Sequence, residues 1–140
     1  MTAKEYLGQV PTLRRQMRRT AEKVKEIETI MQSVRAIRYD KINVQSSPDD
    51  DQLATEMIRL EAAREMLIQQ AADYNIIYAT IRSQIDQMQP QLYRDLLAMR
   101  YLEELSWNKI AAATKYSDTY IRNAHGKALQ EFGRRFLGSR

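Results

Sequence analysis

The sequence predicts an all-α protein: a long antiparallel helical hairpin over residues 1–88, followed by a compact helical module over residues 89–140. Helices are favoured because the 140 residues include only 4 glycines and 3 prolines, whereas sheet-rich folds use more of both in their turns. Hydrophobic residues make up 44% of the chain, which is enough for a core. Many of them recur at intervals of three and four residues, the period of an α-helix.

Two long helices are predicted from seams of side chains spaced alternately four and three residues apart, the pattern of a coiled coil. The first helix spans about residues 12–39, and its seam comprises Leu13, Met17, Thr20, Val24, Ile27, Met31, Val34 and Arg38. The second runs from about residue 53 to 88, and its seam comprises Leu53, Met57, Leu60, Arg64, Leu67, Ala71, Tyr74, Tyr78, Ile81, Ile85 and Met88. A loop is expected between them, over about residues 40–52, because Pro48 and the neighbouring serines and aspartates disfavour a helix interior.

Opposite charges are expected to hold these two helices together in an arm, by which we mean residues 1–88. Residues 1–45 carry 10 Lys and Arg against 5 Asp and Glu, whereas residues 46–88 carry 3 against 8. A basic and an acidic helix joined by a loop should fold back on each other antiparallel. Apolar residues outside the seam leave two arrangements open, a homodimer through the arm or a monomeric arm packed on the C-terminal module. These residues are Ile58, Met66, Ile68, Ile76 and Ile77.

The C-terminal module, residues 89–140, should contain three short helices at about residues 91–103, 107–114 and 118–136. Pro90 suits the first turn of the first helix, and Ser106 and Ser117 are placed to cap the second and third. Ala111 lies where two crossing helices need a small residue, Ser117 follows six positions later, and Ile121 follows four after that. This is the spacing of a helix-turn-helix, in which a short turn holds two helices near-perpendicular.

The stretch RYLEELSWNKIAAATKYSDTYIRNAHGKAL, residues 100–129, resembles region 4 of bacterial sigma factors. The matching positions are Arg100, Tyr101, Leu105, Ser106, Trp107, Ile110, Ala111, Ser117, Ile121, Ala128 and Leu129. Lys109 departs from the glutamate of that pattern, and Lys115 departs from its turn glycine. The whole chain also resembles the ArpU/RinA-like regulators of late operons in phages and prophages of Gram-positive bacteria, through its MTAKEYL opening, the Val44-Gln45-Ser46-Ser47 segment and the sigma-like module. This resemblance implies an activator of phage late genes.

The outward face at the start of the third helix supplies the candidate DNA contacts. Arginine can bind guanine, asparagine adenine, aspartate cytosine, and threonine the methyl group of thymine. The base-contact candidates are Asp118, Thr119, Arg122 and Asn123, which also occupy the positions by which sigma factors read promoters. The phosphate-contact candidates are Arg100, Lys109, Lys115, Tyr120 and Lys127. The alternative is that all of them are solvated surface residues. Gly126 indicates either a close helix crossing or a close approach to DNA.

No catalytic, cofactor or metal site is expected, so the chain is not predicted to be an enzyme. It has no cysteine, a single histidine, and neither a glycine-rich phosphate loop nor a nucleophile motif. The absence of a signal peptide and of a membrane span predicts a cytoplasmic, nucleoid-associated protein of the bacterial host cell, with no membrane partner. The first hypothesis is a sequence-specific regulator that binds double-stranded DNA. Two alternatives stay open: a DNA-packaging adaptor resembling a small terminase subunit, and a sigma-like module that docks on RNA polymerase.

Overall fold

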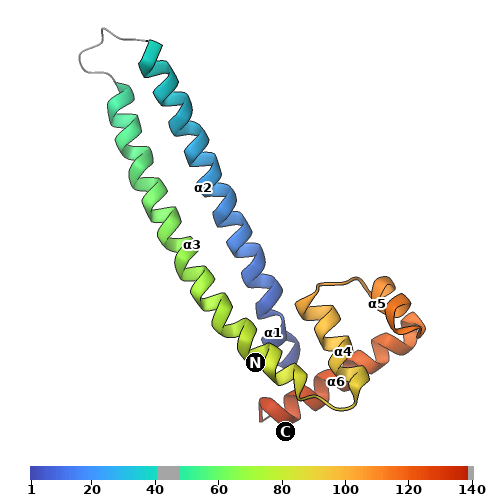
Figure 1. Cartoon of the computed structure of the whole chain (residues 1–140). Coiled ribbons are helices and arrows are strands. Elements are labelled where there is room, and N and C mark those ends of the chain that lie inside the picture. Colours follow the sequence, from blue (N-terminus) through green and yellow to red (C-terminus); the bar gives the residue numbers. More distant parts are fainter. Residues whose placement is uncertain (41–47, 139–140) are drawn as a thin grey trace. The chain divides into compact units, whose positions relative to one another are not determined.

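The computed structural model describes residues 1–40 and 48–138, with side chains described for residues 1–37 and 51–138 (Figure 1). Over these ranges the chain is all-helical. The elements are α1 (Ala3–Leu7), α2 (Gln9–Asp40), α3 (Pro48–Asp86), α4 (Gln91–Leu97), the π-helical turn η1 (Ala98–Leu102), α5 (Trp107–Thr114) and α6 (Asp118–Phe136). They form two compact units: unit 1 comprises residues 1–14 and 74–140, and unit 2 comprises residues 15–73.

Unit 1 is built from both ends of the chain. Its core joins side chains of the first fourteen residues and of the last turns of α3 to those of the C-terminal module. The buried members are Leu7, Val10, Ile81, Ile85, Met88, Leu96, Leu97, Tyr101, Leu102, Ile110, Ile121, Ala124, Ala128 and Phe132. This division differs from the boundary expected at residue 88. The physical reason is that the short helices of the module bury their apolar faces against α1 and α3 as well as against one another.

Unit 2 consists of the remaining parts of α2 and α3, which lie side by side within it (Figure 1). Its core contains Ile27 and Met31 from α2 and Leu60 and Ala63 from α3. The seam predicted for the first helix is correct, because every member with a described side chain is buried or half-buried: Leu13, Met17, Thr20, Val24, Ile27, Met31 and Val34.

The seam predicted for the second helix is wrong at two positions in unit 2. Met57 is 46% exposed and Arg64 is also exposed, whereas Glu56 and Ala63 are buried in their place. The small side chain of Ala63 occupies the core beside α2. Arg64 instead projects from the edge of the pair, where its guanidinium lies 3.2 Å from a carboxylate oxygen of Glu28. That ion pair has the reverse of the polarity expected for a basic first helix and an acidic second one.

Three local features differ from the sequence expectations. The opening residues form α1, which was not expected, and Thr2 and Glu5 cap its N-terminus reciprocally. Helix α3 begins at Pro48, so residues 48–52 are helical and not part of a loop, since proline suits the first helical position. The Val44–Ser47 segment lies outside the described residues. The helix expected over residues 91–103 is present as α4 continued by η1.

Candidate nucleic-acid interface

The helices α5 and α6 begin at the serines that the sequence indicated. The Ser106 hydroxyl accepts a hydrogen bond from the Lys109 backbone N–H (3.3 Å), and the Ser117 hydroxyl accepts one from the Tyr120 backbone N–H (3.1 Å). Each bond satisfies a backbone donor that the first turn of a helix leaves free. Ile110 from α5 and Ile121 from α6 are fully buried. The two helices therefore have fixed starting points and a common core.

The turn between α5 and α6 contains a left-handed residue. Lys115 has φ 63° and ψ 26°, a conformation that costs a non-glycine residue about 1 kcal/mol. The conformation is the one that a glycine at this position would adopt without strain. Lys115 therefore adopts the conformation that glycine favours and adds an exposed ammonium group beside the start of α6.

The base-contact candidates lie together on the first turns of α6. Thr119, Arg122 and Asn123 are exposed, while Asp118 is partly buried. The Arg122 Nε lies 2.9 Å from the Asp118 Oδ2, so Asp118 orients the arginine. Because Nε makes this pair, the Nη1 and Nη2 edge that could bind guanine bidentately is not used by it. The other carboxylate oxygen of Asp118 is buried without a hydrogen-bond partner.

Trp107 supports this face from beneath. The Arg122 guanidinium carbon lies 5.7 Å from the centre of the indole ring, and the Arg100 guanidinium carbon lies 4.2 Å from it. The ring of His125 meets Trp107 edge-on at 4.8 Å. Each guanidinium gains cation–π energy from the indole, so Trp107 helps to hold Arg122 in place.

His125 is a packed residue of this cluster. Its Nε2 lies 2.8 Å from the Tyr101 hydroxyl, and the two rings stack with centres 5.7 Å apart. Burial, with smaller contributions from Arg100 and Lys4, lowers the pKa of His125 to about 4. The ring is therefore neutral at pH 7, and the Tyr101 hydroxyl can donate to it. A neutral, half-buried imidazole contributes packing and no phosphate-binding charge.

Four of the five phosphate-contact candidates are exposed: Lys109, Lys115, Tyr120 and Lys127. The fifth, Arg100, is turned inward, since its guanidinium covers Trp107 and donates to the Leu105 carbonyl at 3.0 Å. Tyr116, which was not among the expected contact residues, lies beside Tyr120. Its ring stacks on that of Tyr120 with centres 4.5 Å apart, and both rings are nearly half exposed. The four-residue spacing of the two tyrosines is a signal that could have indicated this pair.

Gly126 has open space around it. A Cβ built on this residue would meet no atom within 4 Å, so the close helix crossing offered as one reason for the glycine is not present among the described residues. Gly126 lies one turn beyond Arg122 and Asn123 on the same exposed face of α6. The glycine thus keeps the backbone of this face uncovered.

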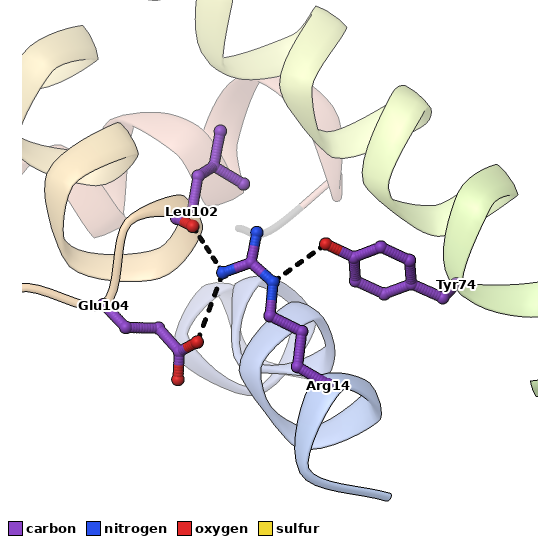
Figure 2. A network of polar contacts seen from close by, with 4 residues as sticks. All are labelled: Arg14, Tyr74, Leu102 and Glu104. Carbon is purple, nitrogen blue, oxygen red and sulfur yellow. Dashed lines mark hydrogen bonds and ion pairs between the residues drawn. The ribbon is translucent and has the colours of Figure 1, made fainter. Parts of the chain in front are cut away.

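A second polar network fixes the segment that leads into α5 (Figure 2). The Arg14 guanidinium donates to the Tyr74 hydroxyl at 2.8 Å, to the Leu102 carbonyl and to a Glu104 carboxylate oxygen at 3.2 Å. Glu104 itself adopts the left-handed conformation, with φ 55°. Arg14 therefore joins α2 and the Tyr74 turn of α3 to the residues that precede the Ser106 cap.

Comparisons with protein-family models, curated proteins and solved structures gave no match. Among the described residues there is no group of three or more histidine, cysteine and acidic side chains that could hold a metal ion. No helix in the described parts of the chain is long and apolar enough to cross a membrane.

Proposed function

We propose that the chain is a sequence-specific regulator of transcription that binds double-stranded DNA. In this proposal α5, the turn at Lys115 and α6 form a helix-turn-helix like region 4 of sigma factors, and α6 enters the major groove. The arm would be an antiparallel hairpin, which the core and the Glu28–Arg64 ion pair shared by α2 and α3 support. The site of action would be the nucleoid in the cytoplasm of a bacterial host.

The observation that carries the proposal is the composition of one exposed face of α6. Thr119, Arg122 and Asn123 project from its first turns, and the open Gly126 follows them. A helix-turn-helix reads bases in the major groove with side chains of these types on the N-terminal turns of its second helix. A buttressed arginine also loses less conformational entropy on binding than a free one, and Arg122 is held by both Asp118 and Trp107.

The charges around this face fit phosphate binding. Lys109, Lys115 and Lys127 are exposed, and residues 89–140 carry 9 Lys and Arg against 5 Asp and Glu. Lysines at the rim of a recognition helix position the protein on the duplex without reading its sequence. Activation of phage late genes is the regulatory role that the resemblance to the ArpU/RinA-like proteins supports.

The test is selection of bound duplexes from a random pool by the full chain, followed by anisotropy titrations with the selected site and a scrambled one. Arg122→Ala should weaken binding to the selected site by about 1–3 kcal/mol and leave the scrambled site almost unaffected. Lys127→Ala should weaken both equally and reduce the slope of log K against log salt by about 1. Lys23→Ala, an exposed lysine of unit 2, is the matched control for loss of charge.

Failure to enrich any sequence, together with affinity that is independent of salt, would contradict the proposal. That result would favour the alternative in which the module binds a protein such as RNA polymerase. The stacked and exposed Tyr116 and Tyr120 pair supports this alternative, because tyrosine is enriched at protein interfaces. Loss of polymerase binding in the Tyr116→Ala variant, with DNA binding unchanged, would identify it.

A further inference from the structure

Helix α3 carries a second row of side chains, on the face opposite to the one that packs in unit 2. The row comprises Ile58, Ala62, Glu65, Gln69, Ala72 and Ile76, and all six residues are exposed. Their spacings alternate strictly between four and three, which keeps them in one line along a helix. Ile58 and Ile76 each lie nine residues from the half-buried Leu67, or about two and a half helical turns, so they face away from it.

The exposed isoleucines of this row are unusual for an outer surface. Ile58 is 68% exposed and Ile76 is 67% exposed. Met66 and Ile68, which flank the row on its two sides, are 56% and 64% exposed. Clustered large apolar side chains on a helix surface indicate a binding partner more often than isolated ones do. All of these residues belong to one unbroken helix, so their alignment requires only helical geometry.

The order of residues in the row indicates which partner fits. The row has the same kinds of residues in either direction: Ile58 corresponds to Ile76, Ala62 to Ala72, and Glu65 to Gln69. In a two-fold symmetric interface, residue i of one copy meets residue j of the other, and j meets i. Antiparallel pairing centred on residue 67 would therefore place isoleucine on isoleucine and alanine on alanine. Because the row has the same residue types in both directions, it can pair antiparallel with the same row of a second copy.

Residues beside the row fit the same arrangement. Met66 and Ile68 lie next to the centre, so each would meet its own counterpart in the second copy. On the Met66 side, Arg59 and Asp73 lie seven residues before and after Met66 and carry opposite charges. The central Glu65 and Gln69 can form hydrogen bonds across the two-fold axis, and a polar layer within an apolar seam fixes the register of a coiled coil.

We propose that α3 forms an antiparallel, two-fold symmetric dimer with α3 of a second copy of this chain, centred on residue 67. The dimer does not require DNA binding, so it can be tested independently of the proposed function. Such a dimer would carry two copies of the C-terminal module.

The first test is the oligomeric state of the full chain by light scattering at micromolar concentration. The wild type should be a dimer. Ile58→Glu changes the interface at two symmetric places, so it should weaken dimerisation on the order of 100-fold or more while the circular dichroism stays helical. Ile37→Glu is the matched control, because Ile37 of α2 is 47% exposed and lies outside the row. A monomeric wild type, or an Ile58→Glu variant as dimeric as the control, would overturn the proposal.

The second test fixes the direction of pairing. The chain has no cysteine, so single substitutions can be joined with a short bifunctional maleimide. Ala62→Cys and Ala72→Cys lie about 15 Å apart along the helix. In the antiparallel dimer neither variant should link to itself, whereas a mixture of the two should give a covalent dimer. A parallel dimer would give the opposite result, with each variant linking to itself, and would refute the proposed pairing, as would a mixture that does not link.

Discussion

Lowering the pH from 7 to 5 should destabilise the fold through His125, the one histidine of the chain. The pKa of His125 is lowered from 6.5 to about 4 in the folded state. On acidification the unfolded chain takes up a proton near pH 6.5, whereas the folded chain does not until about pH 4. The stabilisation is therefore complete above pH 6.5 and is lost as the pH falls from 6.5 to 4. It is limited to about 3 kcal/mol, of which about 1.5–2 kcal/mol disappears between pH 7 and 5.

Urea unfolding followed by circular dichroism at pH 7, 6 and 5 measures this loss. Carboxylates titrate mostly below this window. The change in the free energy of unfolding between pH 7 and 5 therefore comes chiefly from the histidine. In the His125→Gln variant the amide can still accept a hydrogen bond from the Tyr101 hydroxyl. Its free energy of unfolding should be nearly the same at pH 7 and pH 5. A nuclear magnetic resonance titration of the single imidazole gives the pKa directly. A folded-state pKa near 6.5, or an unchanged loss of stability between pH 7 and 5 in His125→Gln, would refute the reasoning.

Three further substitutions test the structure. Lys115→Gly should raise the free energy of unfolding by about 1 kcal/mol, because glycine adopts the left-handed conformation without strain; Tyr116→Gly, its neighbour outside that conformation, should lower it. Arg14→Ala should cost about 2–4 kcal/mol in urea unfolding, since three acceptors lose a charged donor, and Arg14→Lys should recover only part, because an ammonium group cannot reproduce the planar fork. Gly126→Ala should add up to about 1 kcal/mol to stability and, if α6 approaches DNA closely, weaken binding to the selected site. An Ala variant that is destabilised would contradict the open space found there.

The helices and their starting points were predictable because local chemistry determines them. Ser106 and Ser117 cap backbone groups only three residues away, so the signal lies within one turn. The buried face of α2 followed from spacing alone. The face of α3 in unit 2 did not, because Met57 is more apolar than its neighbour Glu56 and yet is the exposed one. Which of the two side chains is buried depends on where α2 packs against α3, and the residue spacing of α3 alone does not give that position.

The candidate interface was predictable in its exposed residues and not in its supports. Thr119, Arg122 and Asn123 are exposed as expected. The contacts of Arg14, in contrast, join residues 60 to 90 positions apart, and no periodicity links such distant positions. Arg100 looked like a free surface cation because the sequence does not reveal that Trp107 lies beneath its guanidinium.

The composition of unit 1 has a consequence for the order in which the chain folds. Leu7 and Val10 are completely buried in the same core as Phe132, so residues very far apart in the sequence must meet before this core forms. The contacts of unit 2 join residues within 15–73 and are therefore more local. Unit 2 is thus expected to fold before unit 1.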